Sequence, residues 1–544
     1  MKKILCLLLT VLLSAGAAAG CAGGPAPGTD PATDEASATV TESAPATEEE
    51  TEPLTEEETE PVTEEETEPV TYGEFIVVPD ETVTLSVPRI YGDHMVLQRD
   101  EKIRIRGYSD KDGTEIRGLF MDDEARAVAA DGKWELVFSP KSATAEPQTL
   151  TIDDSCGNTV KFEDVLVGDV WFIGGQSNAE VTFAELPTLI SSLSVDESMP
   201  VRLFMQGARY VIDHREDAKE PCDNVLNPSW YWKKLNRGNA VAFSVLGYYF
   251  GCRIAADAGV PVGVISVAAS GAKINELMPA ELVQEFKYRV GGNVGPSEFY
   301  NMLVHPFVGM RFKGLVFFQG ESEGFMGANP SPKKYSHDFK ALMTEYRQRW
   351  GFEFPIYNVQ LSDYTSKGIS FCPNSGYIRA QQFNAYLAMT GVRLIPSYDL
   401  GSDENDPNYM HSPYKKELAD RIADAVLADL YGADGAEKTL APEMESVALS
   451  DDKTYYTVKF KNVGEGLISD SGDGKIEGFG VGVIGGLKPA EAEIISADTV
   501  KVTVPAKAKL SGVGYVASPH VDKNASHLRS SYGMPALAFY KALK

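Results

Sequence analysis

The chain has few cysteines, few histidines and, in one long segment, no basic residues. Only 6 of its 544 residues are Cys and 7 are His. No CxxC pair occurs among the cysteines, which argues against a zinc ribbon or a thioredoxin-like redox site. Beyond the first 21 residues the cysteines are too widely spaced for a disulfide scaffold: Cys156, Cys222, Cys252 and Cys372. Whether any two of them pair stays open.

The charge balance excludes two classes of partner. The chain carries 78 acidic against 50 basic side chains, a formal net charge of -28. Such a charge repels a phosphate backbone, so nucleic acid is a poor partner, and anionic membranes are equally poor. With 43% hydrophobic residues the chain cannot be wholly disordered, and its length predicts several domains.

Residues 1–20 read as a secretory signal peptide. Lys2 and Lys3 precede an apolar run that ends in small residues just before Cys21. These small residues resemble the lipobox of bacterial lipoproteins, in which the cysteine becomes the lipidated N-terminus. We therefore expect a secreted protein anchored to the outer face of a bacterial membrane by lipidated Cys21. Plain cleavage that leaves an unmodified cysteine is the alternative.

An acidic linker is expected from residue 21 to residue 73. Residues 22–72 contain 16 Asp and Glu and no Lys or Arg, and a Glu-Glu-Glu-Thr-Glu-Pro motif recurs every eight residues from Glu48 onward. Such a segment buries little apolar surface, while charge repulsion and proline keep it extended. We expect a disordered stalk.

The remaining sequence predicts three folded regions. Residues 74–165 hold short alternating runs separated by turn residues, which favours an N-terminal β-sandwich domain. From 166 to 435, continuous apolar runs alternate with helical stretches, which predicts a three-layer α/β domain with a mainly parallel sheet. Residues 436–544 return to short strands and predict a C-terminal β-sandwich-like domain. The expected strands and helices are 75–78, 82–87, 102–107, 133–138, 149–152, 170–174, 243–258, 260–267, 314–318, 336–350, 355–361, 391–395, 413–431, 455–460, 493–495, 500–504 and 514–516.

Polar residues follow three of the expected parallel strands. In an open α/β sheet, ligands bind at the carboxyl ends of the strands. After the first run come Gly174, Gly175, Gln176 and Ser177, and a serine on such a tight turn can present both its hydroxyl and its N–H to a carbonyl carbon. Gly271 follows the second run and can supply another N–H, and Gln319 follows the third and can supply a side-chain donor.

A nucleophilic serine needs a base, and His411 is the best candidate. It lies in a loop between the last expected strand and the last expected helix. The other six histidines fall in β segments, in an apolar run, at a helix start or in a charged stretch without a strand end: His94, His214, His305, His337, His520 and His527.

These motifs together resemble the SGNH hydrolases, specifically the sialate O-acetylesterase family. The similar blocks occur in order along nearly all of 85–540: Pro88-Arg89-Ile90, Asp93 to Gln98, Gly168-Asp169-Val170-Trp171, Gly175-Gln176-Ser177-Asn178, Phe299-Tyr300-Asn301, His305-Pro306, Gly320-Glu321-Ser322, His411 and Tyr532 to Ala536. The resemblance implies an SGNH-hydrolase-like catalytic domain at 166–435, flanked by the two β domains.

The resemblance also implies residue roles. Ser177 would be the acyl-accepting nucleophile and His411 the base, and the N–H groups of Ser177 and Gly271 with the Gln319 side chain would hold the oxyanion. No metal or cofactor is implied.

The acid that orients His411 stays unassigned. Many SGNH enzymes place an Asp three residues before the histidine, where this chain has Asn408, and Tyr409 replaces an Asp often found two before it. The candidates are Asp406, Asp403 and Glu321, and a backbone carbonyl is an open alternative.

The sequence thus predicts a carbohydrate esterase that removes O-acetyl groups from sialic acid or another acetylated glycan through an acetyl-serine intermediate. The alternative is a non-catalytic carbohydrate-binding surface protein on a degenerate esterase scaffold, which the substituted Asn408 and Tyr409 favour. The sequence names neither the sugar nor the oligomeric state.

Overall fold

A computed structural model of the chain describes residues 72–288, 295–325, 328, 330–366, 369–370, 372–402 and 410–543. The predicted signal peptide, lipidated Cys21 and acidic linker lie outside these residues, apart from 72–73, and so do Asp403, Asp406, Asn408 and Tyr409. Within the described ranges, no helix has the length and apolar character needed to cross a membrane.

A large mixed sheet forms the centre of the fold. Its strand order is β10-β9-β11-β8-β12-β13-β16, with β10 antiparallel to β9 and the following pairs parallel. The bounds are β8 (Thr159–Gly175), β9 (Val201–Met205), β10 (Lys233–Lys234), β11 (Val262–Ser266), β12 (Gly314–Phe318), β13 (Ile356–Gln360) and β16 (Val392–Pro396). Ile173 lies opposite Ser266 and Gly175 opposite Phe318, so β8, β11 and β12 end side by side.

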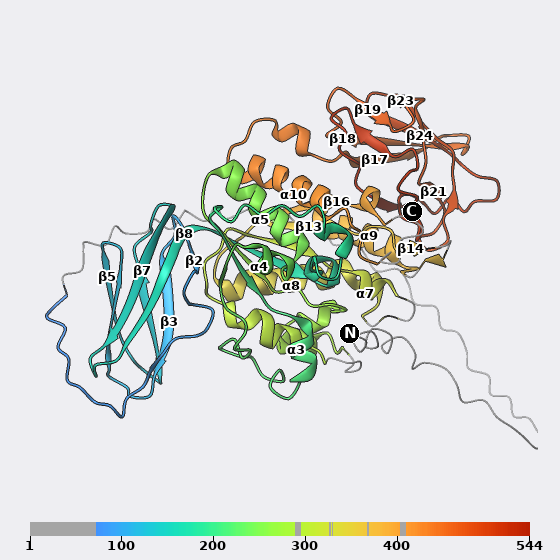
Figure 1. Cartoon of the computed structure of the whole chain (residues 1–544). Helices are drawn as coiled ribbons and strands as arrows, with labels where there is room; N and C mark the ends of the chain where they lie inside the picture. Colours follow the sequence, from blue (N-terminus) through green and yellow to red (C-terminus); the bar gives the residue numbers. More distant parts are fainter. Residues whose placement is uncertain are drawn as a thin grey trace, which may run out of the picture. The chain divides into compact units, whose positions relative to one another are not determined.

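Helices cover both faces of this sheet (Figure 1). Trp171 and Phe172 are consecutive on β8 and therefore point to opposite faces. The Trp171 ring lies 5.1 Å from Phe250 on α5, and the Phe172 ring lies 6.2 Å from Trp350 on α8. The helix bounds are α1 (Ser177–Glu180), α2 (Pro187–Ile190), α3 (Ala208–Asp213), α4 (Arg237–Val241), α5 (Val245–Ala258), α6 (Ala280–Glu285), α7 (Glu321–Gly324), α8 (Tyr335–Trp350), α9 (Ser375–Leu387) and α10 (Lys415–Leu430). The predicted three-layer α/β arrangement is present.

Strand β8 also belongs to the N-terminal sheet region. Its first half pairs antiparallel with β7 and its middle pairs parallel with β2. The strands of this region are β1 (Leu85–Ser86), β2 (Val96–Gln98), β3 (Ile103–Ser109), β4 (Glu115–Phe120), β5 (Asp123–Val128), β6 (Lys133–Phe138) and β7 (Thr144–Asp154). The boundary expected between 165 and 166 thus falls inside one continuous strand. The assignment of this region as a separate sandwich domain stays a prediction.

The C-terminal region contains further antiparallel sheets. Their orders are β17-β18-β24-β23-β20, β19-β26 and β22-β21-β25-β27. The bounds are β17 (Glu443–Leu449), β18 (Tyr455–Lys461), β19 (Leu467–Ser469), β20 (Lys475–Ile476), β21 (Phe479–Val481), β22 (Lys488–Pro489), β23 (Ala492–Ser496), β24 (Thr499–Thr503), β25 (Gly512–Tyr515), β26 (Leu528–Ser530) and β27 (Phe539–Ala542); the small pair β14 (Thr365–Ser366) and β15 (Ile369–Ser370) lies earlier in the chain. The sandwich assignment of this region also stays a prediction.

Two local expectations differ from the structure. Residues 75–78 form no strand, and only Leu85–Ser86 of the run 82–87 is extended in a sheet. Ile76 and Val78 are 63% and 68% exposed, so their apolar side chains do not mark a buried strand.

The four cysteines of the described chain are free thiols: Cys156, Cys222, Cys252 and Cys372.

Candidate active site

Ser177 stands at a sharp turn from strand to helix. It is half-buried and is the first residue of α1, which Gln176 separates from the end of β8. Gly175 makes the turn possible, because its φ is 124° and an added Cβ would lie 2.0 Å from the Phe318 carbonyl oxygen. The amides of a first helical turn have no acceptor within their own helix. Because Ser177 is the first residue of α1, its N–H is free of the helix's own hydrogen bonds and can face a ligand oxygen.

Hydrogen bonds join the three loops that follow β8, β11 and β12. Ser322 Oγ donates to the Gly271 carbonyl at 3.0 Å, and the Ser322 N–H donates to Gln176 Oε1 at 3.2 Å. The Gln319 side chain donates to the Ala272 carbonyl at 3.1 Å. The expected convergence of the three strand ends is thus present in the structure.

The Glu180 carboxylate holds the loop that follows β11. This residue is 8% exposed and lies one helical turn beyond Ser177. Its carboxylate accepts the Ala208 N–H at 3.0 Å and also the Ser270 N–H, which directly precedes Gly271. Burial raises the pKa of Glu180, and these two N–H donors work against that rise. The carboxylate therefore holds the backbone directly before Gly271.

Gln319 is fully buried and its amide hydrogens already have acceptors. Its Nε2 donates to Glu323 Oε2 at 2.7 Å and to the Ala272 carbonyl at 3.1 Å. A third, longer hydrogen bond of 3.4 Å runs from the same nitrogen to Gln176 Oε1. These contacts favour a role in holding the loops together. Its predicted part as an oxyanion donor stays a prediction, because it requires one of these bonds to be given up.

His411 lies in a half-buried loop that is held on both sides. The Asn178 side chain donates to the Met410 carbonyl at 3.1 Å, so the residue after Ser177 binds the residue before His411. On the other side, Ser412 Oγ donates to the Leu400 carbonyl. The two predicted reacting side chains, 234 positions apart in the sequence, thus lie on segments that touch.

The imidazole of His411 is neutral at pH 7, because its pKa is lowered. Burial, followed by the positive charge of Lys415, lowers the pKa of His411 to about 4, while Glu185 acts in the opposite direction. Within the described residues, no carboxylate forms a hydrogen bond with this ring. A neutral imidazole is the form that can accept a proton from a serine hydroxyl.

Glu321, one of the three acids proposed to orient His411, has one of its two carboxylate oxygens bound to other side chains. It is fully buried, and its Oε1 accepts hydrogen bonds from Asn178 at 2.7 Å and from the Tyr364 hydroxyl at 2.9 Å. Burial raises the pKa of this carboxyl. The other two acids lie outside the described residues.

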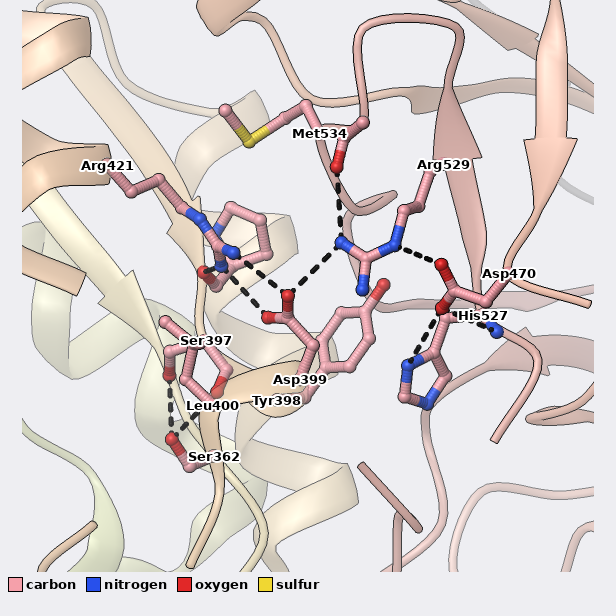
Figure 2. A network of polar contacts seen from close by, with 12 residues as sticks. Ser362, Ser397, Tyr398, Asp399, Leu400, Arg421, Asp470, His527, Arg529 and Met534 are labelled. Atoms are coloured by element: carbon pink, nitrogen blue, oxygen red, sulfur yellow. Dashed lines mark hydrogen bonds and ion pairs between the residues drawn. The ribbon is translucent and has the colours of Figure 1, made fainter. Parts of the chain in front are cut away.

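A buried ion-pair network ties together the flanks of the segment that carries His411 (Figure 2). Asp399, in the short helix η5 (Tyr398–Leu400) after β16, accepts two hydrogen bonds of 2.9 Å from Arg421 on α10. Arg529 on β26 adds a bond of 3.2 Å and also donates to Asp470 at 2.6 Å. Burial acts to raise the pKa of Asp399, but the two guanidinium groups outweigh it, so this pKa lies below its ordinary value.

Sequence reasoning did not predict the structural roles of three residues: Glu180, Asn178 and Lys415. Asn178 was visible only as part of the Gln-Ser-Asn motif, and Glu180 as an acidic residue one turn later. Lys415 carried no signal, because a lysine at the start of a helix is usually exposed. In the described residues, no group of three or more His, Cys, Asp and Glu is arranged to hold a metal ion.

Comparison with known proteins agrees with this architecture. Residues 167–428 match the carbohydrate esterase family described as sialic acid-specific acetylesterase. Sialate O-acetylesterases from Pongo abelii and Homo sapiens are each 26% identical, over 278 and 231 residues, which are 46% and 38% of this chain. The alignments cover 51% and 42% of those relatives, so the chain spans about half the length of the relatives it matches.

A solved structure shows the same fold over most of the chain. The crystal structure of a carbohydrate acetylesterase from Xanthomonas citri superposes with a TM-score of 0.69 at 24% identity, covering 84% of this chain and 99% of that one. The residues that match the family run from β8 to α10, and they include Ser177 and His411. The part of the chain that carries Ser177 and His411 is therefore similar to the sialic acid-specific acetylesterase family of carbohydrate esterases.

Proposed function

We propose that this protein is a carbohydrate O-acetylesterase that releases acetate from an acetylated sugar through an acetyl-Ser177 intermediate. The observation that carries the proposal is the bond from Asn178 to the Met410 carbonyl, which joins the segments of Ser177 and His411. The family match to residues 167–428 supports the same reaction class.

The first half of the reaction transfers the acetyl group to the enzyme. Ser177 Oγ attacks the ester carbonyl carbon while His411 accepts the hydroxyl proton. The N–H groups of Ser177 and Gly271 are aimed at the oxygen that becomes negative, with Gln319 as the predicted third donor. The intermediate collapses, the bond between the carbonyl carbon and the sugar oxygen breaks, and His411 returns its proton to that oxygen.

The second half regenerates the serine. His411 accepts a proton from water, whose oxygen attacks the acetyl carbon of acetyl-Ser177. The ester bond to Ser177 breaks, acetate leaves, and the proton returns to Ser177 Oγ. Because His411 must be neutral at the start of each half, its lowered pKa keeps the base competent at acidic pH.

Replacing the nucleophile tests the proposal. We expect Ser177→Ala to lower acetate release from an aryl acetate by at least about 1000-fold, since the covalent route is lost. Ser192→Ala is the matched control, because Ser192 is exposed and its hydroxyl donates to the nearby Leu189 carbonyl. Undiminished turnover in Ser177→Ala would reject the mechanism. Glycan binding without any wild-type turnover would favour the non-catalytic carbohydrate-binding alternative.

The substrate and the location of the protein are part of the proposal. O-acetyl sialic acid and acetylated plant glycans present the same ester to the site, so acetate release across a panel of acetylated glycans identifies the sugar. Lipidated Cys21 would hold the enzyme at the outer face of the membrane. Metabolic labelling with a fatty acid, compared between wild type and Cys21→Ser, tests this anchor.

A further inference from the structure

The side chain of Asn178 connects three segments of the site. Its Nδ2 donates to Glu321 Oε1 at 2.7 Å and to the Met410 carbonyl at 3.1 Å, and its Oδ1 accepts from Lys415 Nζ at 2.6 Å. Asn178 is 2% exposed. Both hydrogens and the carbonyl oxygen of this amide are therefore used inside the protein.

The two outer partners of Asn178 are a buried cation and a buried acid. Lys415 is 2% exposed and Glu321 is fully buried. Burial lowers the pKa of Lys415 to about 7, with Glu321 acting against that change. Removing two charged groups from water is unfavourable, and a hydrophobic pair of similar size is often as stable. A buried pair at this position therefore needs an explanation other than stability.

The location of the network supplies that explanation. Asn178 follows Ser177, Glu321 begins α7 after β12, and Lys415 begins α10 four residues after His411. Rotation of the Asn178 amide would break its bond to the Met410 carbonyl, which is the tie between the loop of His411 and the Ser177 turn.

We propose that Lys415 is a positioning residue of the esterase: together with Glu321 it locks the Asn178 amide, and through Met410 it holds the His411 loop against the Ser177 turn. This inference rests on the proposed function and adds to it a device that holds the loop of the base.

The charge of Lys415 gives the device a second effect. Positive charge near His411 opposes protonation of the imidazole, and Glu185, in the segment after α1, opposes it in turn. At the acidic pH where His411 titrates, Lys415 is itself protonated, because its pKa is about 7. Loss of this charge raises the pKa of His411 and moves the acid limb of the pH–rate profile to higher pH.

The experiment compares Lys415→Met with Lys416→Met in the full chain, using an aryl acetate. Lys416 is the matched control, since it is exposed and pairs with Asp420 on its own helix. We expect Lys415→Met to lower kcat by about 10- to 100-fold with KM changed less than about threefold, because a misplaced base affects the chemical step. The acid limb moves upward in the same variant. Equal kcat and equal acid limbs in the two variants would overturn the inference.

Two further measurements keep the test decisive. If Lys415→Met fails to fold, the double variant Lys415→Met with Glu321→Gln removes both charges; a folded double variant with lowered kcat supports the inference, and one with wild-type kcat overturns it. An NMR titration of His411, assigned with His411→Gln, needs no turnover. An unchanged His411 pKa in Lys415→Met contradicts the inference, whereas absent turnover in wild type and Lys416→Met contradicts only the proposed function.

Discussion

Arg421 binds both carboxylate oxygens of Asp399 at 2.9 Å and thereby connects the two ends of the segment that carries His411. Asp399 lies just after β16 and Arg421 lies on α10, and the histidine loop runs between them. The loop of the base thus depends on a buried ion pair that touches neither reacting residue.

We expect Asp399→Asn to lower the free energy of unfolding by about 3–5 kcal/mol, because it removes the carboxylate that pairs with the largely buried guanidinium of Arg421. Urea unfolding followed by circular dichroism measures the effect. Asp257→Asn, which breaks a half-exposed pair with Arg253, is the control and should cost less than about 1 kcal/mol. Equal losses in the two variants would contradict a structural role for Asp399.

The same pair predicts a pH dependence of stability. The folded-state pKa of Asp399 lies below that of the unfolded chain, so its contribution is complete above the unfolded value and is lost as pH falls through the folded value. We therefore expect the stability difference between wild type and Asp399→Asn to shrink in acid. A difference that stays constant down to the acid transition would argue against it.

The acid limb of activity should lie well below neutrality. Because burial and Lys415 lower the pKa of His411 to about 4, we expect half-maximal kcat/KM near pH 4 and not near the ordinary value of about 6.5 for histidine. Circular dichroism at each pH separates titration from unfolding. A limb near pH 6.5 in folded protein would indicate that a carboxylate supports the imidazole.

Glu180→Gln tests how the Gly271 amide is aimed. One of the two carboxylate oxygens becomes an NH2 group, which cannot accept from Ala208 or Ser270. We expect kcat to fall about 10-fold, less than the roughly 100-fold loss typical when an oxyanion donor is removed outright. Glu281→Gln, an exposed carboxylate 72% accessible, serves as the control. Unchanged kcat would exclude a positioning role for Glu180.

The central sheet was predictable because its strands are buried on both faces. β11 and β12 read as nearly continuous apolar runs, and the polar residues after β8, β11 and β12 marked the site. The bonds from Ser322 to Gly271 and Gln176, and from Gln319 to Ala272, confirm that these strand ends converge.

Helix α9 could not be predicted in the same way. Three of its buried residues are polar: Ser375, Arg379 and Gln382. Arg379 donates to the carbonyls of Val516 and Ser362, and Gln382 donates to that of Gln319. The helix shows no continuous apolar stripe, because these polar residues occupy buried positions. The groups that they bind lie on other segments of the chain, so the sequence of the helix gives no sign of them. Lys415 was missed for the same reason, since its burial depends on Asn178, 237 positions earlier.

The most direct test of the account is to trap the acylated enzyme. Rapid mixing with an aryl acetate, acid quenching and peptide mass spectrometry should find one acetyl group on the peptide that contains Ser177, formed in wild type and absent in Ser177→Ala. In His411→Gln the same adduct should form far more slowly. Acetate release by the wild type without any acetyl group on Ser177 would contradict the mechanism.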